Sequence, residues 1–451
     1  MAIVLKIKKG LDIKLTGKAP EKIISVGRSD NYAIVPDNFP GLKPKIIVRV
    51  GDYVKVGTPV MIDKDTPDIK VVSPVSGEVM AINRGEKRKI LNVTIKPDGR
   101  KEYVRFDIND IETYDEKGLK EILLESGMWP YIKQRPFDRI ANPSDTPRDI
   151  FVSAYNSAPL APDFNFIVKG EEDVLQKGLD VLASLTQGKV YLGVKPGSPL
   201  LKMAGVEVVE LYGPHPVGNV GVMINNIKPV NKGEVVWTMN AADVLYIGRL
   251  FKKGIVDFSR TVAITGSEII DKGYARVVAG CTIDSLVDDN IKIKNYHIRF
   301  VSGNVLTGQK VDYCDYLGAF ENQVTVIPEG DDVDEFFGWV MPGIEKYSAS
   351  RTYFSWLTGK FIPEYTIDAR LRGGRRAMIM SDEYAKVFPM DILPEYLLKA
   401  IIAFDVDKME DLGIYEVAPE DFALCEFVDT SKIEIQKIVR NGLDLLYKEM
   451  I

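Results

Sequence analysis

The chain has 451 residues with 58 basic and 64 acidic side chains, a formal charge of −6, and 45% hydrophobic residues. This length predicts two to four domains, and the absence of a long basic tract argues against a nucleic-acid partner. No stretch approaches the roughly 20 apolar residues of a membrane-spanning helix, and three cysteines without a CxxC pair argue against an iron–sulfur cluster or a structural zinc.

Residues 1–107 are predicted as a barrel-sandwich domain of the biotinyl or lipoyl type. The N-terminal MAIVLKIKKGLDIKL alternates apolar and basic residues, which is typical of a strand and not of a signal peptide. Two related stretches follow, IIVRVGDYVKVGTPVMI and KVVSPVSGEVMAINRG, and each reads as strand, glycine turn and strand. Short strands separated by such turns indicate a compact β-domain.

Lys64 lies between these two stretches, in the turn where a carrier domain bears its modified lysine. The spacing from Lys64 to Ser73 is longer than in lipoyl domains, Pro67 and Asp68 stand nearer the apex of the turn, and no MKM is present. The turn chemistry therefore favours an ordinary solvated lysine. A covalent biotin or lipoyl carrier is kept as an alternative.

Residues 108–265 are predicted as a Rossmann-like α/β domain with a parallel sheet. Strands alternate with helices here, which favours parallel strands joined by helical crossovers. The helix at 171–188 is expected to end at Gly188, as the one at 115–127 ends at Gly127. A further helix is expected within 235–254, and the expected strands are 148–156, 189–197, 206–213 and 259–269.

The turns after these strands lack a dinucleotide-binding loop. Such a loop needs G-x-G-x-x-G between the first strand and its helix, so that the backbone approaches a pyrophosphate. Here SAPLAP follows the first strand, LGVKPGSPL has the wrong glycine spacing, and GPHPVGNVG carries only a weak signal. His215 in the last of these turns and His297 in a strand are both interpreted as structural, with His215 the better candidate for a site.

Residues 266–330 are predicted as a β-grasp-like (SLBB-type) α+β domain, because short strands surround one short helix, TIDSLVDD. Residues 331–451 are predicted as a mixed, mainly helical C-terminal domain that ends in EIQKIVRNGLDLLYKEM. Within it, RLRGGRRAMIM groups four arginines around two glycines. This stretch is interpreted as a solvated loop, with an acidic partner surface or lipid headgroups as alternatives.

The loop SGMWPYIKQRPFDRIANPSDTP, residues 126–147, combines aromatic and basic side chains with prolines. Trp129 and Phe137 offer ring faces, and Arg135 a guanidinium group, to a flat ligand such as a quinone. The same residues serve equally well as anchors of a loop or of a partner subunit.

Several blocks of sequence, in order along the first 330 residues, point to one family. They are KKGLDIKLTGKAP, VGDYVKVGTPVMIDKD, PDIKVVSPVSGEVMAINRGEKRKILNV, RPFDRIANP and VVWTMNAADVLYIGRLFKKG. Together they resemble the NqrA family, which is one of the subunits of the sodium-translocating NADH:quinone reductase. The stretch INRGEKR after SPVSG is the most distinctive of them.

The resemblance implies a six-subunit bacterial respiratory complex that oxidises NADH, reduces ubiquinone or menaquinone and exports sodium. An NqrA protein is expected on the cytoplasmic side of the inner membrane, attached through partner subunits. It is expected to carry no redox cofactor and no metal, so NADH, flavins and the iron–sulfur centre fall to the partners. The chain is then part of an enzyme, a translocase, without catalytic residues of its own.

The resemblance also implies a contribution to quinone binding, for which two loops are candidates. One is YAIVPDNFPGLKP, where Tyr32 and Phe39 offer ring stacking and Lys43 a donor. The other is the loop at 126–147, with Trp129, Arg135 and Phe137. A purely structural scaffold of the same complex is the alternative function, ahead of the carrier protein.

Overall fold

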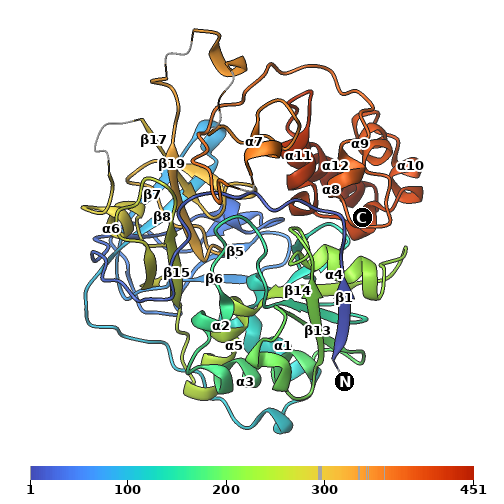
Figure 1. Ribbon diagram of the computed structural model, residues 1–451. Coiled ribbons are helices and arrows are strands. Elements are labelled where there is room, and N and C mark those ends of the chain that lie inside the picture. The colour runs from blue at the N-terminus through green and yellow to red at the C-terminus, as the bar shows by residue number, and fades with distance from the viewer. Residues whose placement is uncertain are drawn as a thin grey trace.

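The computed structural model describes residues 2–292, 297–333, 336–341, 343, 345–359 and 361–450. Its strands form sheets of seven, five, four and three strands. Figure 1 shows the N-terminal half beside the yellow strands of the third unit, with the red C-terminal helices gathered at one side. Within the described part of the chain, no helix is long and apolar enough to cross a membrane.

Two small antiparallel sheets form the N-terminal sandwich, as the glycine-punctuated strands predict. One has the order β2-β8-β7-β4 and the other β3-β5-β6. Val60, Val79 and Val93 are fully buried between them, because alternate strand residues point to the same face. The strands are β2 (Tyr32–Ile34), β3 (Pro44–Ile46), β4 (Tyr53–Val54), β5 (Pro59–Asp63), β6 (Lys70–Val72), β7 (Gly77–Arg84) and β8 (Ile90–Pro97).

The turn between β5 and β6 holds Lys64 exposed, directly after the end of β5. The buried carboxylate of Asp63 fixes the turn, since it accepts the backbone N–H groups of Lys43 at 2.7 Å, Asp65 at 2.7 Å and Thr66 at 2.9 Å. Lys64 therefore sits at the start of the turn and not at its apex, in line with the spacing argument from the sequence.

The largest sheet runs β1-β13-β12-β11-β14-β9-β10. Its first five strands are parallel, and β9 is antiparallel to β14 and to β10. The prediction of a parallel sheet is thus confirmed for the centre of this unit. The strands are β1 (Ile3–Lys6), β9 (Lys133–Arg135), β10 (Arg139–Ile140), β11 (Ile150–Ser153), β12 (Val190–Val194), β13 (Glu207–Tyr212) and β14 (Val236–Asn240).

The first strand, β1, lies at the edge of this large sheet, paired with β13. The sequence places residues 1–107 in one domain, so the structure differs here. The alternating pattern of the N-terminus predicts a strand correctly, but the pattern carries no information about which strand lies beside it.

Helices pack on the faces of the large sheet. They are α1 (Glu116–Glu125), α2 (Phe164–Ile167), α3 (Glu172–Ala183), α4 (Val220–Ile227) and α5 (Ala241–Lys253). The helix α5 ends at Gly254 in the left-handed conformation, as glycine permits. The prediction that α3 ends at Gly188 is wrong, since Ser184 caps it. Gly188 instead lets the chain pass the Arg148 carbonyl, which a Cβ atom there would overlap.

The third unit is a five-stranded sheet with the order β16-β15-β19-β17-β18. The strand predicted at 259–269 as part of the parallel α/β sheet is β15 of this sheet, so that assignment is wrong. Its antiparallel partner β16 follows it directly in the chain, and a local hairpin partner outcompetes the distant sheet. The elements are β15 (Ser259–Thr265), β16 (Gly273–Val278), α6 (Ile283–Val287), β17 (Ile298–Ser302), β18 (Gln309–Val311) and β19 (Gln323–Pro328).

The C-terminal part is helical, as predicted. Its helices are α7 (Ser355–Thr358), α8 (Tyr384–Val387), α9 (Pro394–Ile402), α10 (Val406–Asp411), α11 (Ala423–Val428) and α12 (Ile435–Met450). One hydrophobic core joins Leu397, Phe422 and Leu443 of this part to Val209 and Met223 of the large sheet and α4. The two parts therefore share a buried interface.

Short 3-10 turns complete the secondary structure. They are η1 (Pro36–Asn38), η2 (Glu86–Arg88), η3 (Ile111–Thr113), η4 (Trp129–Tyr131), η5 (Pro199–Lys202), η6 (Gly338–Val340), η7 (Ile414–Glu416) and η8 (Pro419–Phe422). Of these, η4 begins the aromatic loop at 126–147 and η8 carries two acidic residues, Glu420 and Asp421, toward that loop.

Candidate functional site

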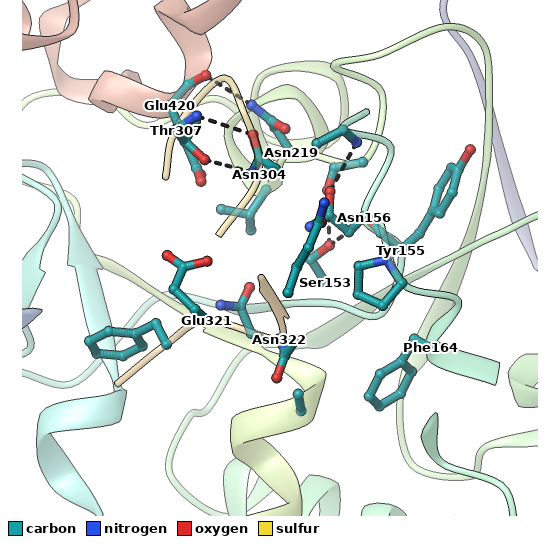
Figure 2. A pocket seen from close by; sticks show the side chains of 18 of the residues that line it. Ser153, Tyr155, Asn156, Phe164, Asn219, Asn304, Thr307, Glu321, Asn322 and Glu420 are labelled. Carbon is teal, nitrogen blue, oxygen red and sulfur yellow. Dashed lines mark hydrogen bonds between the residues drawn. The ribbon is translucent and has the colours of Figure 1, made fainter. Parts of the chain in front are cut away.

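A cavity of about 310 Å³ lies at the carboxyl ends of the parallel strands (Figure 2). Ser153 ends β11, Asn240 ends β14, and His215 follows β13, and all three line the cavity. In open parallel sheets this edge is the usual place for a ligand, because the loops there diverge and leave a crevice. The position of the cavity thus follows from the topology of the sheet.

Three other parts of the chain close the cavity. Lys133 and Asp138 come from the aromatic loop, Phe320 and Glu321 from the third unit, and Glu420 from the C-terminal helices. Figure 2 shows Glu321 and Asn322 among the side chains at the cavity, with Glu420 near Asn304 and Thr307. Ligand pockets favour such junctions between units.

Hydrogen bonds hold several of the polar wall residues in place. Ser153 Oγ donates to the Gly218 carbonyl at 2.9 Å, and Asn219 Nδ2 donates to the Glu420 carbonyl at 3.2 Å. Asn304 closes its own turn, because its Oδ1 accepts the N–H of Leu306 at 2.8 Å and its Nδ2 donates to Thr307 Oγ1 at 2.8 Å. These walls are therefore built before any ligand arrives.

Other polar wall atoms are buried without a hydrogen-bond partner among the residues that the structure describes. They are Nε2 of His215, Oδ1 of Asn322 and Oε1 of Gln323. Leaving one such group unsatisfied costs about 1–3 kcal/mol, so native proteins rarely leave three beside one cavity unless water or a ligand meets them. This grouping makes the cavity the candidate binding site.

The ring of His215 lies against the hydroxyl group of Ser157. The Ser157 hydroxyl oxygen accepts the Gly218 N–H at 2.9 Å, and it lies 3.0 Å from His215 Nδ1. When the hydroxyl donates its proton to Nδ1, the ring proton lies on Nε2. Burial lowers the pKa of His215 to about 4. The ring is therefore neutral at physiological pH, and its Nε2 atom has no hydrogen-bond partner among the described residues.

Acidic and basic groups face each other across the cavity. The Lys133 amine lies 4.8 Å from the centre of the Phe320 ring, which is a favourable cation–π position. Although the surface of Glu321 is only half-buried, its carboxyl group is enclosed within the protein, and this desolvation raises its pKa to about 7. Burial likewise raises the pKa of Glu420. The cavity combines the Lys133 amine with two carboxyl groups whose pKa values are raised.

Comparison with known proteins decides the family. Residues 5–98 match the NqrA N-terminal barrel-sandwich hybrid domain, residues 114–256 the NqrA second alpha/beta domain, and residues 261–312 the NQRA C-terminal domain. The corresponding Na(+)-translocating NADH-quinone reductase subunit of Pasteurella multocida (strain Pm70) is 36% identical over 452 residues, covering 99% of this chain and 100% of the relative. The chain belongs to the NqrA family.

Two further relatives support the assignment to the NqrA family. The same Na(+)-translocating NADH-quinone reductase subunit from Yersinia pestis bv. Antiqua (strain Angola) and from Haemophilus influenzae (strain 86-028NP) is in each case 35% identical and covers 99% of this chain and 100% of the relative. Among solved structures, an NAD+-reducing [NiFe]-hydrogenase in the H2-reduced state reaches a TM-score of 0.35 at 11% identity, over 68% of this chain and 55% of that one. That likeness is too weak to bear on the site. The resemblance found from the sequence and the N-terminal barrel-sandwich are confirmed.

The first predicted quinone loop of this NqrA protein does not reach the large cavity. Tyr32 is half-buried in β2, and Lys43 is exposed and pairs with Asp65 at 2.6 Å. Phe39 is buried, with its ring 5.5 Å from that of Phe320. It lines a separate void of about 30 Å³, which has room for one water molecule and not for a ring.

The second predicted loop supplies the wall of the cavity through residues that the sequence did not single out. Trp129 is fully buried and donates from Nε1 to the Ala141 carbonyl at 2.7 Å. Phe137 packs edge-on against Tyr447, with ring centres 5.3 Å apart. Lys133 and Asp138 of the same loop line the cavity. The loop was found from the sequence, but its two lining residues were not.

Arg135 lies fully buried behind the cavity wall. Its Nη2 is 3.6 Å from Glu420 Oε1 and 3.9 Å from Asp421 Oδ2, and none of its side-chain nitrogens makes a hydrogen bond within the described part of the chain. Asp421 is neutralised in part by burial, which raises its pKa to about 7.

Glu321 and Glu420 lie far from Lys133 along the chain, so no sequence motif could have joined these residues.

Proposed function

We propose that this NqrA protein binds the head group of a quinone in the cavity at the carboxyl edge of the large sheet, and so contributes to the quinone site of the complex. The observation that carries the proposal is the grouping of unpartnered polar atoms in the wall. The relatives are subunits of a Na(+)-translocating NADH-quinone reductase, and a quinone presents two carbonyl oxygens that accept hydrogen bonds.

The chemistry of the wall fits such a ligand. A quinone needs donors to its carbonyl oxygens and an apolar slot for its ring. His215 Nε2–H and the Lys133 amine supply the donors, and Phe320 supplies an aromatic face. Phe164 and Ile167 add apolar wall. The volume of about 310 Å³ lies at the lower end of the range for small-molecule pockets, which suits a head group without its tail.

In this proposal, the residues predicted from the sequence pack behind the residues that line the cavity and do not contact the quinone themselves. Arg135, Phe137 and Trp129 hold the loop that presents Lys133 and Asp138. Phe39 packs behind Phe320. Tyr32 pairs with Cys281 of the third unit, whereas Lys43 contacts Asp63 and Asp65 within the N-terminal domain.

The remaining features of the complex belong to the same proposal. Electrons enter from NADH and pass through flavins and an iron–sulfur centre of partner subunits, in a six-subunit assembly on the cytoplasmic side of the bacterial inner membrane. The second unit is interpreted as Rossmann-like without a nucleotide loop, and the third as β-grasp-like. The missing glycine fingerprint supports the absence of a nucleotide loop, and the missing CxxC pair supports an iron–sulfur centre in a partner subunit.

Photoaffinity labelling of the intact complex tests the proposal. A photoreactive quinone analogue should label peptides that contain Lys133, His215 and Phe320, and an excess of unlabelled quinone should prevent the labelling. Labelling of other subunits without any label on this chain would overturn the quinone role.

A scaffold without quinone contact is the second candidate function. The deep burial of Trp129 and the packing of Phe137 favour it, since both residues serve the fold. Under this alternative, Trp129→Ala and Phe137→Ala reduce the yield of assembled complex while the remaining complex binds quinone with unchanged affinity. Under the quinone proposal, the same variants weaken binding in the complex that assembles.

A further inference from the structure

One face of the last helix, α12, contacts loops that form the cavity. Gln436, Arg440 and Tyr447 are spaced by four and seven residues, so their side chains lie along one stripe of the helix. The neighbouring face, which carries Val439 and Leu446, is buried in the core shared with the large sheet. This core fixes the position of the helix and leaves the stripe free to contact other parts of the chain.

Arg440 holds a turn of the aromatic loop. Its Nη1 donates to the Asp138 carbonyl at 3.1 Å, and its Nη2 donates to the Phe137 carbonyl. Nη1 also lies 3.8 Å from Asp138 Oδ2, and Asp138 lines the cavity. A guanidinium group presents its donors in a rigid fork, so one side chain can bind two successive carbonyls. Arg440 therefore fixes both the backbone and the side chain of a cavity-wall residue.

The turn that Arg440 holds has a strained backbone. The φ angle is 83° at Phe137 and 48° at Asp138. Both values lie in the left-handed region, where a Cβ atom crowds the backbone. Two successive non-glycine residues of this kind persist only where the surrounding structure holds them, and such residues gather at functional sites. Without the hydrogen bonds from Arg440, we expect the turn to relax and to displace Asp138 from the cavity wall.

Two other residues of the stripe also contact the cavity walls. Tyr447 packs edge-on against Phe137, and the Arg139 guanidinium group lies 3.6 Å from the centre of the Tyr447 ring. Gln436 lines the cavity and donates from Nε2 to the Leu306 carbonyl at 3.0 Å. Leu306 belongs to the third unit, whereas Phe137 and Arg139 belong to the aromatic loop. One helix face thus joins two walls that come from different units.

We propose that α12 sets the width of the cavity, with Arg440 as the positioning residue that holds Asp138 and the aromatic loop opposite the third unit. This inference rests on the proposed quinone site and deepens it, because it names the element that controls the geometry of that site. Arg440 is not one of the described residues that line the cavity. It therefore acts through the loop and not on the ligand itself.

Binding of a quinone analogue to the full chain, measured by titration calorimetry, tests the inference. Arg440→Met removes every donor and keeps a long side chain, and it should weaken binding about tenfold, because the wall must then be ordered when the ligand binds. Arg440→Lys keeps a cationic donor and should recover part of the affinity. Lys437→Met is the matched control, since Lys437 lies on the solvent face of the same helix with 71% of its side chain exposed. It should bind as wild type.

Hydrogen exchange of the backbone amides is a second readout that needs no ligand. In Arg440→Met, the amides of residues 133–141 should exchange faster than in wild type, because the turn has lost two of its hydrogen bonds. The amides of β12, in the centre of the same large sheet, should exchange as in wild type.

The outcomes separate this inference from the quinone proposal. A wild-type chain that binds no quinone analogue overturns the quinone site, and the exchange of residues 133–141 then decides whether Arg440 holds the wall. Wild-type binding with equal affinity in Arg440→Met overturns the positioning role alone. An equal loss of affinity in Lys437→Met, or equally faster exchange in β12, also overturns it, because the effect would then be a general loss of stability.

Discussion

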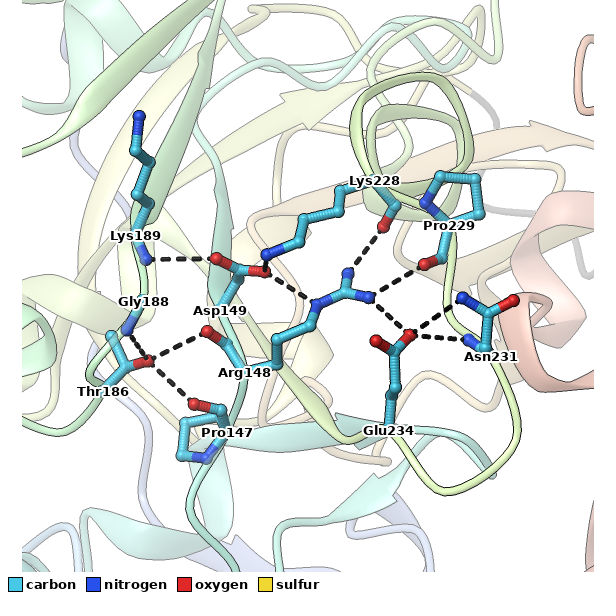
Figure 3. Close-up of polar contacts among 10 residues, drawn as sticks. All are labelled: Pro147, Arg148, Asp149, Thr186, Gly188, Lys189, Lys228, Pro229, Asn231 and Glu234. Carbon is cyan, nitrogen blue, oxygen red and sulfur yellow. Dashed lines mark hydrogen bonds and ion pairs between the residues drawn. The ribbon is translucent and has the colours of Figure 1, made fainter.

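The two ends of the large parallel sheet are built in opposite ways. At the amino end, Asp149 is buried and its carboxylate accepts hydrogen bonds from Arg148 Nε at 2.8 Å, Lys228 Nζ at 2.7 Å and the Lys189 N–H at 3.1 Å (Figure 3). Arg148 in turn donates to the Pro229 and Lys228 carbonyls and to Glu234. At the carboxyl end, by contrast, three residues that line the cavity, His215, Asn322 and Gln323, each have a buried polar atom without a partner among the described residues.

The contrast separates the end of the sheet that stabilises the fold from the end that is proposed to bind a ligand. A buried charge that is fully paired contributes to the fold, and its loss is costly because its partners stay behind. A buried polar atom that lacks a partner weakens the fold but is free to bind a ligand. The Asp149 network therefore stabilises the sheet at one end, and the cavity at the other end is the proposed ligand site.

The largest expected effect is on the Asp149 network. Asp149→Ala should lower the free energy of unfolding by about 3 kcal/mol, because two cations and a backbone N–H lose their shared acceptor. Glu321→Gln at the cavity is the matched comparison and should not lower it, because the folded state already favours the uncharged form of this side chain. Urea denaturation measures both. Equal losses for the two variants would remove the distinction between the ends of the sheet.

The second effect is on ligand affinity. His215→Phe removes the Nε2–H donor and should weaken the binding of a quinone analogue to the chain about tenfold, or about 1.4 kcal/mol, whereas His215→Gln keeps a donor and should bind nearly as wild type. Since the pKa of His215 lies at about 4, wild-type affinity should not depend on protonation of this ring between about pH 5.5 and 8. Titration calorimetry measures the affinities, and equal binding by both variants contradicts the proposed donor role of His215.

A smaller effect concerns the pH dependence of stability. Burial raises the pKa of Glu321 to about 7, against about 4.3 in an unfolded chain. The folded state therefore favours the protonated carboxyl, so its contribution to stability is full below about pH 4.3 and is lost as the pH rises through about 7. From about pH 5 to pH 8 the thermal midpoint of wild type should fall about 2 °C more than that of Glu321→Gln. If calorimetric scans show the same fall of the thermal midpoint for wild type and Glu321→Gln, Glu321 titrates with an ordinary pKa.

The smallest effect is expected at Lys64, far from both ends of the sheet. Lys64→Ala should leave assembly and activity of the complex unchanged, and the chain purified from its host should have the unmodified mass of about 50.4 kDa. Intact mass spectrometry decides this. An added mass that disappears in the variant would restore the carrier alternative.

Much of the local structure could be predicted from the sequence. Helix α1 has Leu119 and Leu123 on one face, Asp115 as its N-cap and Gly127 after its end, and all of these signals are local. The loop that builds one wall of the cavity was found from its composition. The lining residues Lys133, Glu321 and Glu420 were not, because their meeting depends on contacts between units that are distant in the chain.

By itself, the sequence determined which segments are strands and helices, which family the chain resembles, and that the glycine fingerprint of a dinucleotide site is missing. Only the tertiary structure decided that β1 lies beside β13, that β15 belongs to the third unit, and that three units meet around His215. The physical reason is that periodicity encodes which face of an element is buried. The partner that buries it is chosen by packing across the whole chain.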